Sequence, residues 1–472
     1  MNSNSNILTP PYLRLGPGFA DVVTPARFPR EILRFRNQRA AGTVGLDTLT
    51  EPEWRAAFAR FAPLPGNLPA PLALRYHGHQ FGSYNPNLGD GRGFLYAQLR
   101  DDRGRLLDLG TKGSGTTPWS RGGDGRLTLK GGVRELLATE MLEALGVDTS
   151  KTFSLIETGE SLTRHDEPSP TRASVLTRLS YSHIRFGSFQ RLARIGDDAG
   201  LRKLLDYAIA EYHPTTTGPA SFLHAVCAAV ATTCGQWMAA GFAHGVLNTD
   251  NMNITGESFD YGPWRFAPVA DPLFVAAYFD ASGLYAWGRQ PEAVRWNLDR
   301  LADALAPLGE PLGSALDGFS SSLFAGLRMG VLTRLGLRSA GEAADTVLVE
   351  EWFRWLERTR APLDQAYFDC FGGKEGQTRR QQSPQSARYR EREFDLLGEL
   401  FSAYLPKAAE RLGDAYLQRE RPIDLRIETV EALWDAIAIA DDWAPLEKHI
   451  AGIRELGALL TGQAGGRYRT TP

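Results

Sequence analysis

The segment from His244 to Gly262, HGVLNTDNMNITGESFDYG, carries residue types that could bind a complex of a metal ion with a nucleotide. A Mg²⁺ ion bound to phosphate oxygens takes carboxylate and amide oxygens as its protein ligands. Asn251 and Asp260 supply one of each, on either side of a stretch, 252–254, that we expect to form a short strand. An ordinary turn rich in aspartate and asparagine is the alternative interpretation of this segment alone.

The spacing of this segment is that of the catalytic loop of protein kinases, with one departure. Kinases have the pattern H-x-D-x-x-x-x-N followed by D-F-G. His244 and Asn251 keep that spacing, and the DYG sequence at 260–262 stands for D-F-G. The catalytic aspartate of a kinase would fall on Val246, which cannot accept a proton. The nearest carboxylate is Asp250, so we expect a proton acceptor that is displaced to this position or missing.

Glycine-rich turns precede this segment and predict a phosphate-binding region. Gly89, Gly91 and Arg92 lie in LGDGRG, and Asp124 and Gly125 lie in a second GDGR sequence. Glycines let backbone N–H groups approach phosphate oxygens, and an arginine adds a charged donor. We expect two backbone cradles around one polyphosphate, although a plain β-turn is the alternative for each.

A predicted hairpin and a predicted helix would place a lysine and a glutamate beside these turns. Strands over Phe94–Leu99 and Arg105–Thr111 lead to Lys112, and Val133–Leu145 predicts an amphipathic helix. A kinase-like lobe needs one helix glutamate to hold the strand lysine toward the phosphates. The helix offers three candidates, and its pattern alone does not choose among Glu135, Glu140 and Glu143.

Two arginines follow the last predicted strand of this region. Strands are predicted over Thr152–Glu157 and Ala173–Leu179, and Arg178 and Arg185 flank a Ser-Tyr-Ser-His turn. Each arginine by itself would be an ordinary surface residue. Together, after the last strand, they could face the same cleft as Lys112.

The rest of the chain is predicted to be mainly helical. The expected helices cover 202–212, 222–240, 291–308 and 346–360, with one more near 51–61. We expect a polar loop over 372–392, a helical final 80 residues and a frayed tail, GGRYRTTP.

Composition and charge exclude several classes of protein. The chain has 472 residues, 43% hydrophobic residues and a net charge of −3, which gives no basic surface for nucleic acid. No apolar run is long enough for a membrane span, and the N-terminus shows no targeting pattern, so we expect a cytoplasmic protein with no membrane partner. Three scattered cysteines are too few for a disulfide framework or a zinc site, and we expect no redox switch.

Several long motifs, in one order, resemble the selenoprotein O family (SelO, called YdiU in bacteria). The matching blocks are GHQFGSYNPNLGDGRG, LGTKGSGTTPWSRGGDGR, the RE of GGVRELLATE, VLTRLSYSHIRFGSF and HGVLNTDNMNITGESFDYGP. The similarity runs from about Leu72 to Leu348 and continues more weakly to the end. Three features differ from the family pattern: Gly131-Gly132 replaces Ser-Ser before Arg134-Glu135, the stretch after Asp271 is diverged, and the C-terminal region lacks the cysteine or selenocysteine of many members.

The resemblance implies an α+β, protein-kinase-like two-lobed fold with extensions at both ends. The implied division is an N-terminal extension (1–75), an N-lobe (76–190), a C-lobe with the catalytic loop (191–345) and a helical C-terminal extension (346–472). It also implies a protein adenylyltransferase that transfers AMP from ATP to Ser, Thr or Tyr hydroxyls of proteins and releases pyrophosphate. UMP transfer from UTP is a further option, and the alternatives are an ATP-binding pseudokinase with weak activity or an atypical kinase. Val246 argues against a kinase, and a complete metal site argues against a scaffold.

The resemblance also assigns roles to individual residues. Asp250 would be the proton acceptor, and Asn251 and Asp260 would hold Mg²⁺ or Mn²⁺. Lys112 would contact phosphate and pair with Glu135. The nucleotide would be lined by Gly89, Gly91, Arg92, Asp124, Gly125, Arg178, Arg185 and Asp260.

Overall fold

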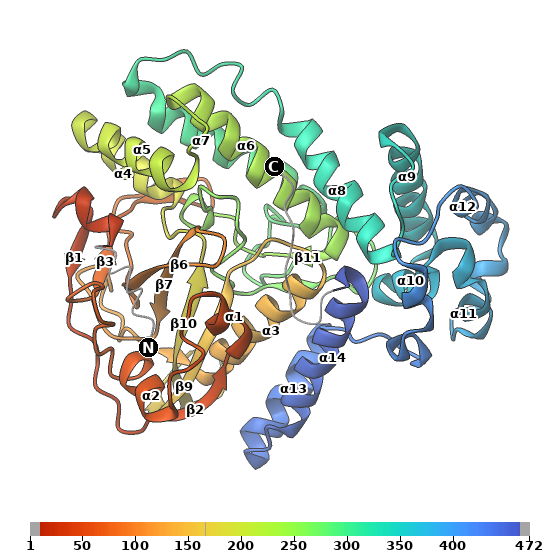
Figure 1. The fold of residues 1–472 in the computed structure, drawn as a ribbon, viewed down its shortest axis with the longest axis horizontal. Helices are drawn as coiled ribbons and strands as arrows, with labels where there is room; N and C mark the ends of the chain where they lie inside the picture. The colour runs from red at the N-terminus through yellow and green to blue at the C-terminus, as the bar shows by residue number, and fades with distance from the viewer. Residues whose placement is uncertain (1–9, 166, 463–472) are drawn as a thin grey trace.

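Strands from the N-terminal part of the chain form one curled antiparallel sheet (Figure 1). The computed structural model describes residues 10–165 and 167–462. The strands of this sheet are β1 (Ala20–Val22), β2 (Ile32–Arg36), β3 (Leu72–Leu74), β6 (Leu95–Arg100), β7 (Leu106–Lys112), β8 (Leu127–Thr128), β9 (Lys151–Leu162) and β10 (Thr171–Ser180). Their order across the sheet is β1-β3-β6-β7-β10-β9-β2, and β8 pairs with β10. The four strands predicted around the site are therefore present.

The first 75 residues contribute strands to both edges of this sheet. Ala20 in β1 pairs with Leu74 in β3, and Ile32 in β2 pairs with Glu157 in β9. The helices of this stretch are α1 (Gln38–Thr43) and α2 (Glu51–Phe58). Trp54 of α2 stacks on Phe153 at a centroid distance of 5.1 Å, so the predicted helix near 51–61 covers one face of the sheet.

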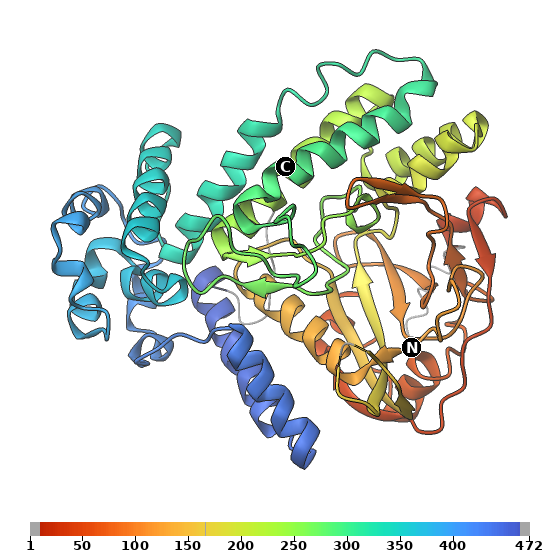
Figure 2. The ribbon, with the colours of Figure 1, turned by 180° about the vertical axis from the view of Figure 1, so that it is seen from behind.

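A single long helix, α3 (Leu129–Ala144), packs on the sheet and holds the predicted helix glutamates. It begins at Leu129 rather than at Val133 because the Thr128 side chain caps it, accepting a hydrogen bond from the Gly131 N–H. The C-terminal helix α14 (Ala444–Thr461) lies along α3, and Arg454 bonds Glu140 there at 2.8 Å (Figure 2). The end of the chain thus stabilises the helix next to the sheet.

Helices dominate the chain after β10. The long helix α6 is buried along much of its length and packs against α8 (Figure 1). The helices of this part are α4 (Phe186–Arg194), α5 (Asp198–Tyr212), α6 (Pro219–Ala240), α7 (Gln290–Leu305) and α8 (Phe319–Leu335). Two short ribbons complete the regular strands among the described residues: β4 (Gly78–Gln80) with β5 (Ser83–Asn85), and β11 (Phe242–Ala243) with β12 (Arg265–Phe266).

The last part of the chain is helical, as predicted. Figure 1 shows α9 to α12 gathered at one end of the molecule. Helices α13 and α14 lie apart from this group and extend from the lower side of the molecule in that view. These helices are α9 (Glu342–Thr359), α10 (Leu363–Cys370), α11 (Gln377–Gln382), α12 (Asp395–Phe401), α13 (Ile427–Ala440) and α14. The predicted frayed tail lies outside the described residues. No described helix is both long and apolar enough to cross a membrane.

Two local predictions are wrong. Residues 252–254 form no strand, because their backbone pairs with residues 184–186 through a single bridge, Arg185 with Asn253. The polar stretch 372–392 is not a simple loop, since it contains α11 and short 3₁₀ turns. Arginine side chains order it: Arg380 donates to the Gly373 carbonyl at 2.7 Å, and Arg379 donates to the Phe368 carbonyl at 2.7 Å. Such side-chain bonds to the backbone leave no periodic signal in the sequence.

Candidate active site

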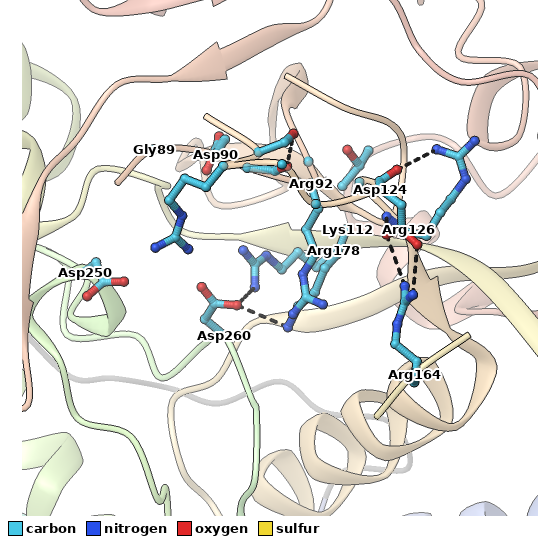
Figure 3. Close-up of a pocket in the computed structure, with 18 of the residues that line it drawn as sticks. Gly89, Asp90, Arg92, Lys112, Asp124, Arg126, Arg164, Arg178, Asp250 and Asp260 are labelled. Carbon is cyan, nitrogen blue, oxygen red and sulfur yellow. Dashed lines mark hydrogen bonds and ion pairs between the residues drawn. The ribbon is translucent and has the colours of Figure 1, made fainter. Parts of the chain in front are cut away.

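A pocket of about 840 Å³ lies between the glycine-rich turns, strands β7 and β10, and the turns that carry Asp250 and Asp260 (Figure 3). Figure 3 shows Asp250 at one end, Asp124 with Arg164 at the other, and Asp260 between them. Ten of the predicted site residues line it: Gly89, Gly91, Arg92, Lys112, Asp124, Gly125, Arg178, Arg185, Asp250 and Asp260. The other two, Glu135 and Asn251, contact or adjoin lining residues without lining the pocket themselves.

The predicted contact between β7 and α3 is present. Lys112 Nζ lies 2.7 Å from Glu135 Oε2, and Glu135 is 1% exposed. Arg178 Nη1 lies 3.5 Å from the other oxygen of Glu135. Glu140, the competing candidate, bonds Arg39 and Arg454 instead. The structure therefore selects Glu135 as the partner of the strand lysine.

Asp260 is surrounded by three cations. Its Oδ1 lies 3.2 Å from Lys112 Nζ and 3.3 Å from Arg178 Nη1, and its Oδ2 accepts from Arg185 Nη1 at 2.8 Å. Burial by itself would raise the pKa of Asp260, but the three cations together hold this pKa well below its usual range. The residue also has φ of +63°, an uncommon conformation for a non-glycine residue. A fully ionised carboxylate is thus fixed in the middle of the pocket.

Asp250 is buried without a charged partner on its carboxylate. It lies in the 3₁₀ turn Thr249–Asn251 and is 8% exposed. Among the described residues, its Oδ1 has no hydrogen-bond partner. Burial raises the pKa of Asp250 to about 6, and the nearby Arg185 acts in the opposite direction. A carboxylate with a free oxygen and a raised pKa is suited to accept a proton.

Arg185 links the two aspartate turns. Its Nη1 donates to the backbone carbonyl of Asp250 at 2.6 Å and to the carboxylate of Asp260 at 2.8 Å. The guanidinium also lies over the rings of Tyr76 and Phe259, at 4.6 and 4.8 Å from their centroids. Because Arg185 packs on two rings and bonds both turns, it fixes the spacing between the two aspartates.

The donor set at Asn251 and Asp260 fits a hard divalent cation. Asn251 Nδ2 donates to the Val246 carbonyl at 3.0 Å, which orients the amide and leaves Oδ1 available to a cation. The described residues include no group of three or more His, Cys, Asp or Glu side chains that could hold a metal. A cation here would therefore take its remaining ligands from phosphate oxygens and water, as Mg²⁺ commonly does.

Each glycine turn packs against the segment 115–120 too tightly for a side chain. A Cβ atom on Gly91 would lie 2.8 Å from the Trp119 carbonyl oxygen. Gly125 has φ of +68°, and a Cβ there would lie 2.2 Å from the backbone of Gly115. Ser120 Oγ donates to the Gly91 carbonyl at 2.5 Å, which ties the loops together. Both glycines are thus required by close backbone contact, and this brings main-chain groups to the pocket wall.

Comparisons with known proteins show the family to which this chain is similar. The family model described as "Protein adenylyltransferase SelO" matches residues 4–454. A relative from Synechocystis sp., named "Protein nucleotidyltransferase YdiU", is 45% identical over 91% of this chain and 94% of its own. Relatives of the same name are 44% identical in Gloeobacter violaceus, over 94% of each chain, and 34% identical in Mycobacterium sp. strain KMS, over 92% of each chain.

The chain belongs to the SelO family of protein adenylyltransferases. It is an enzyme of the nucleotidyltransferase class. The pocket and its aspartates are therefore the candidate active site of a SelO-family enzyme.

The residues that position the Asp250 turn in this SelO-family protein were not among those predicted from the sequence. Strand β4 packs on this turn, and the His79 N–H donates to Thr249 Oγ1 at 2.7 Å. Thr249 Oγ1 in turn donates to Gln190 Oε1 at 2.7 Å, and Gln190 Nε2 lies 2.9 Å from His79 Nδ1. His79 thus has a structural role, since it holds Thr249 and Gln190 in place. The sequence did indicate that this segment matters, because it belongs to one of the motifs that resemble the SelO family.

Trp119 and Arg164 were also missed. Trp119 packs so closely on Gly89 that a Cβ there would lie 2.4 Å from its ring, and its Nε1 donates to Asp21 Oδ2 at 2.9 Å. Arg164 pairs with Asp124 at 2.8 Å at the outer end of the pocket. Trp119 lies inside a family block, whereas Arg164 lies in a polar loop with no pattern that would indicate a role.

Proposed function

We propose that this protein transfers AMP from ATP to hydroxyl groups of serine, threonine or tyrosine side chains in other proteins, with release of pyrophosphate. The observation that carries the proposal is the buried Asp250 carboxylate, whose Oδ1 has no partner among the described residues, at the end of a pocket rich in cations. A kinase would have its base at position 246, which is Val246 here. The proton acceptor is therefore placed differently from that of a kinase, and so is the reacting phosphorus.

The cation cluster suits a polyphosphate that enters with its terminal phosphates first. Lys112, Arg178 and Arg185 would hold the β- and γ-phosphates of ATP as the leaving pyrophosphate. The α-phosphorus would then lie near Asp250, and the nucleoside would lie beyond it, on the side away from Asp124. The order of residues along the pocket supports this orientation (Figure 3).

The reaction would be an in-line displacement at the α-phosphorus. Asp250 accepts the proton of the substrate hydroxyl, whose oxygen forms a bond to the α-phosphorus. The bond from the α-phosphorus to the oxygen bridging to the β-phosphorus breaks, and pyrophosphate leaves with both electrons of that bond. Asn251 and Asp260 are the residues that would hold Mg²⁺ or Mn²⁺, which supplies neutralisation of phosphate charge. Positioning and charge neutralisation provide most of the rate enhancement in such reactions.

We also propose that the fold is protein-kinase-like and two-lobed. The Lys112–Glu135 pair between a strand and a helix supports this, as does the division into a sheet region and a helical region. The lobes would be 76–190 and 191–345, flanked by extensions 1–75 and 346–472, with β1 and β2 of the first extension completing the sheet. The cytoplasm is the proposed location because the three cysteines are buried free thiols, as in proteins of reducing compartments.

The test uses two labelled nucleotides in parallel. The purified protein is incubated with Mg²⁺ or Mn²⁺, a mixture of acceptor peptides containing Ser, Thr and Tyr, and ATP labelled at either the α- or the γ-phosphate. We expect label in peptide from the α-position only, with a mass gain of one AMP. Label entering from the γ-position would indicate a kinase, and binding of ATP without any transfer would indicate a pseudokinase. A parallel reaction with UTP measures whether UMP is also transferred.

A further inference from the structure

Three exposed aromatic rings form a patch on the surface near the candidate active site. This aromatic patch consists of Phe81, Tyr278 and Phe279, which are 41%, 80% and 49% exposed. The ring centroids of Phe81 and Phe279 are 6.0 Å apart, and those of Tyr278 and Phe279 are 5.1 Å apart. Single exposed apolar residues are common on protein surfaces, but contiguous ones mark interaction sites.

The patch is tied directly to the turn that carries the proton acceptor. The Phe81 N–H donates to Asn248 Oδ1 at 3.1 Å, and the Tyr285 hydroxyl donates to the same oxygen at 2.8 Å. The rings of Phe81 and Tyr285 also pack, with centroids 5.1 Å apart. Asn248 lies two positions before Asp250 in the sequence. The patch therefore lies next to the turn that carries Asp250.

Both segments of the patch are held in place. Asp280 is buried, and its carboxylate accepts from the N–H groups of Leu284 at 2.9 Å and Tyr285 at 2.8 Å, which fixes the loop with Tyr278 and Phe279. Phe81 has φ of +48°, a strained conformation for an aromatic residue. Backbone strain of this kind gathers at functional sites, where the surrounding structure maintains it. Here the Phe81 ring packs on the buried Tyr285 and remains 41% exposed to solvent.

We propose that the aromatic patch binds an apolar or aromatic side chain of the protein substrate, close in sequence to the hydroxyl that receives AMP. The inference rests on the proposed function and adds a determinant of substrate selection. A Cβ on Gly78 would lie 3.2 Å from Asp250 Oδ1, and three residues of chain lead from Gly78 to Phe81. Extended chain of this length spans about 10 Å. The recognised side chain therefore lies about two to four residues from the modified hydroxyl.

The test measures AMP transfer to a positional-scanning peptide library. Each peptide has one central Ser, Thr or Tyr and a single Leu or Phe at one of the four positions on either side, on a polar background. We expect the wild-type enzyme to prefer one such position by about 10–100-fold in kcat/KM, the range for burial of one apolar side chain. The variant Tyr278→Ser/Phe279→Ser should lose this preference and keep its affinity for ATP.

Two control variants separate recognition from general effects. Tyr278→Phe retains the ring and should retain the preference. Ile439→Ser removes an apolar side chain that is 84% exposed on α13, away from the patch, and should leave the preference unchanged. Binding of ATP, measured by calorimetry on each variant, shows whether the nucleotide pocket is intact.

The outcomes distinguish failure of this inference from failure of the proposed function. AMP transfer by the wild type without a positional preference, or a preference that survives in Tyr278→Ser/Phe279→Ser, would overturn the inference and leave the proposed function standing. Absence of AMP transfer from the wild type to every peptide would overturn both. A shift from dimer to monomer in the double variant, with unchanged peptide preference, would instead identify the patch as a contact between two copies of this chain.

Discussion

Asp250 and Asp260 are the same residue type on neighbouring turns, yet their surroundings push their pKa values in opposite directions. Burial raises the pKa of Asp250 to about 6, whereas Lys112, Arg178 and Arg185 overcome burial and lower the pKa of Asp260. The same Arg185 nitrogen bonds both turns, but it bonds the carboxylate of Asp260 and only the backbone carbonyl of Asp250. One residue is therefore a fixed negative charge and the other a free proton acceptor. Environments that separate the pKa values of two acids in this way assign them different roles.

The largest expected effect comes from removing the fixed charge. Asp260→Ala should abolish AMP transfer, a loss beyond the roughly 10⁴-fold limit expected for a general base. It should also remove the Mg²⁺-dependent tightening of ATP binding, because a carboxylate ligand of the cation is lost. Label transfer and calorimetry with and without Mg²⁺ measure both effects. Asp299→Ala, which removes a surface carboxylate paired with Arg295, is the matched control. Mg²⁺-dependent turnover in Asp260→Ala would show that the cation is held elsewhere.

Removing the proton acceptor should have a smaller and more selective effect. Asp250→Ala should lower kcat by roughly 10²–10⁴-fold, the usual scale for a general base. ATP affinity should change little, since the cation cluster lies around Asp260 rather than around the Asp250 carboxylate. Rate and binding measurements on one preparation test this division. If both variants lose ATP binding to the same degree, the two aspartates do not have the different roles proposed here.

The pair that supports the cation cluster should behave as one unit. Lys112→Ala and Glu135→Ala should each weaken activity, and the double variant should lose little more than either single one. The expected coupling is about 1–3 kcal/mol, because the two side chains are in direct contact and buried. Glu140→Ala is the control, since Glu140 bonds Arg39 and Arg454 and should combine additively with Lys112→Ala. Additive losses for Lys112→Ala and Glu135→Ala would show that the two residues do not act as a pair in catalysis.

The sequence predicted the chemical groups of the site better than the strands and contacts that hold them in place. The glycine turns, Lys112 and the DYG segment are short patterns in which residue type follows from chemical need, so each could be located. The strands β1 and β2 could not, because each is short and its pairing with β3 or β9 depends on contacts distant in sequence. The motif that includes His79 pointed to function, but its packing on Thr249 required coordinates.

The sequence pattern also could not distinguish between similar residues on one helix. Three glutamates on α3 had equal patterns, and only the family resemblance favoured Glu135 before the distances to Lys112 were known. The predicted strand over 252–254 failed because its backbone meets a loop and not a second strand. The partner of Lys112 and the conformation of 252–254 both depend on residues that are distant in sequence. Local periodicity carries no information about such residues.

The smallest expected effect concerns a third acid, which tests whether a raised pKa alone indicates catalysis. Burial, followed by Asp148, raises the pKa of Glu257 to about 8, yet Glu257 does not line the nucleotide pocket. Its Oε2 accepts from the Tyr181 N–H at 2.8 Å, which is a structural role. Glu257→Gln should therefore leave kcat within about twofold of the wild type, in contrast to the aspartate variants.

The effect of Glu257 should be seen in stability as a function of pH. Because the folded pKa of about 8 exceeds the ordinary value of 4.5, the folded state binds more protons between these values. The free energy of unfolding should then fall as pH rises through this window and level off above it. Glu257→Gln keeps an acceptor for Tyr181 and removes the ionisation, so its Tm should exceed that of the wild type by a few degrees at pH 8, and the difference should vanish near pH 4.

The control variant is Glu143→Gln, whose Tm should be lower than that of the wild type at pH 8, because Lys151 and Arg39 hold the pKa of Glu143 down against burial. Thermal unfolding of the three proteins from pH 4 to pH 9 measures this, and a parallel pH profile for Glu257→Gln and the wild type would show that Glu257 is ionised in the folded protein.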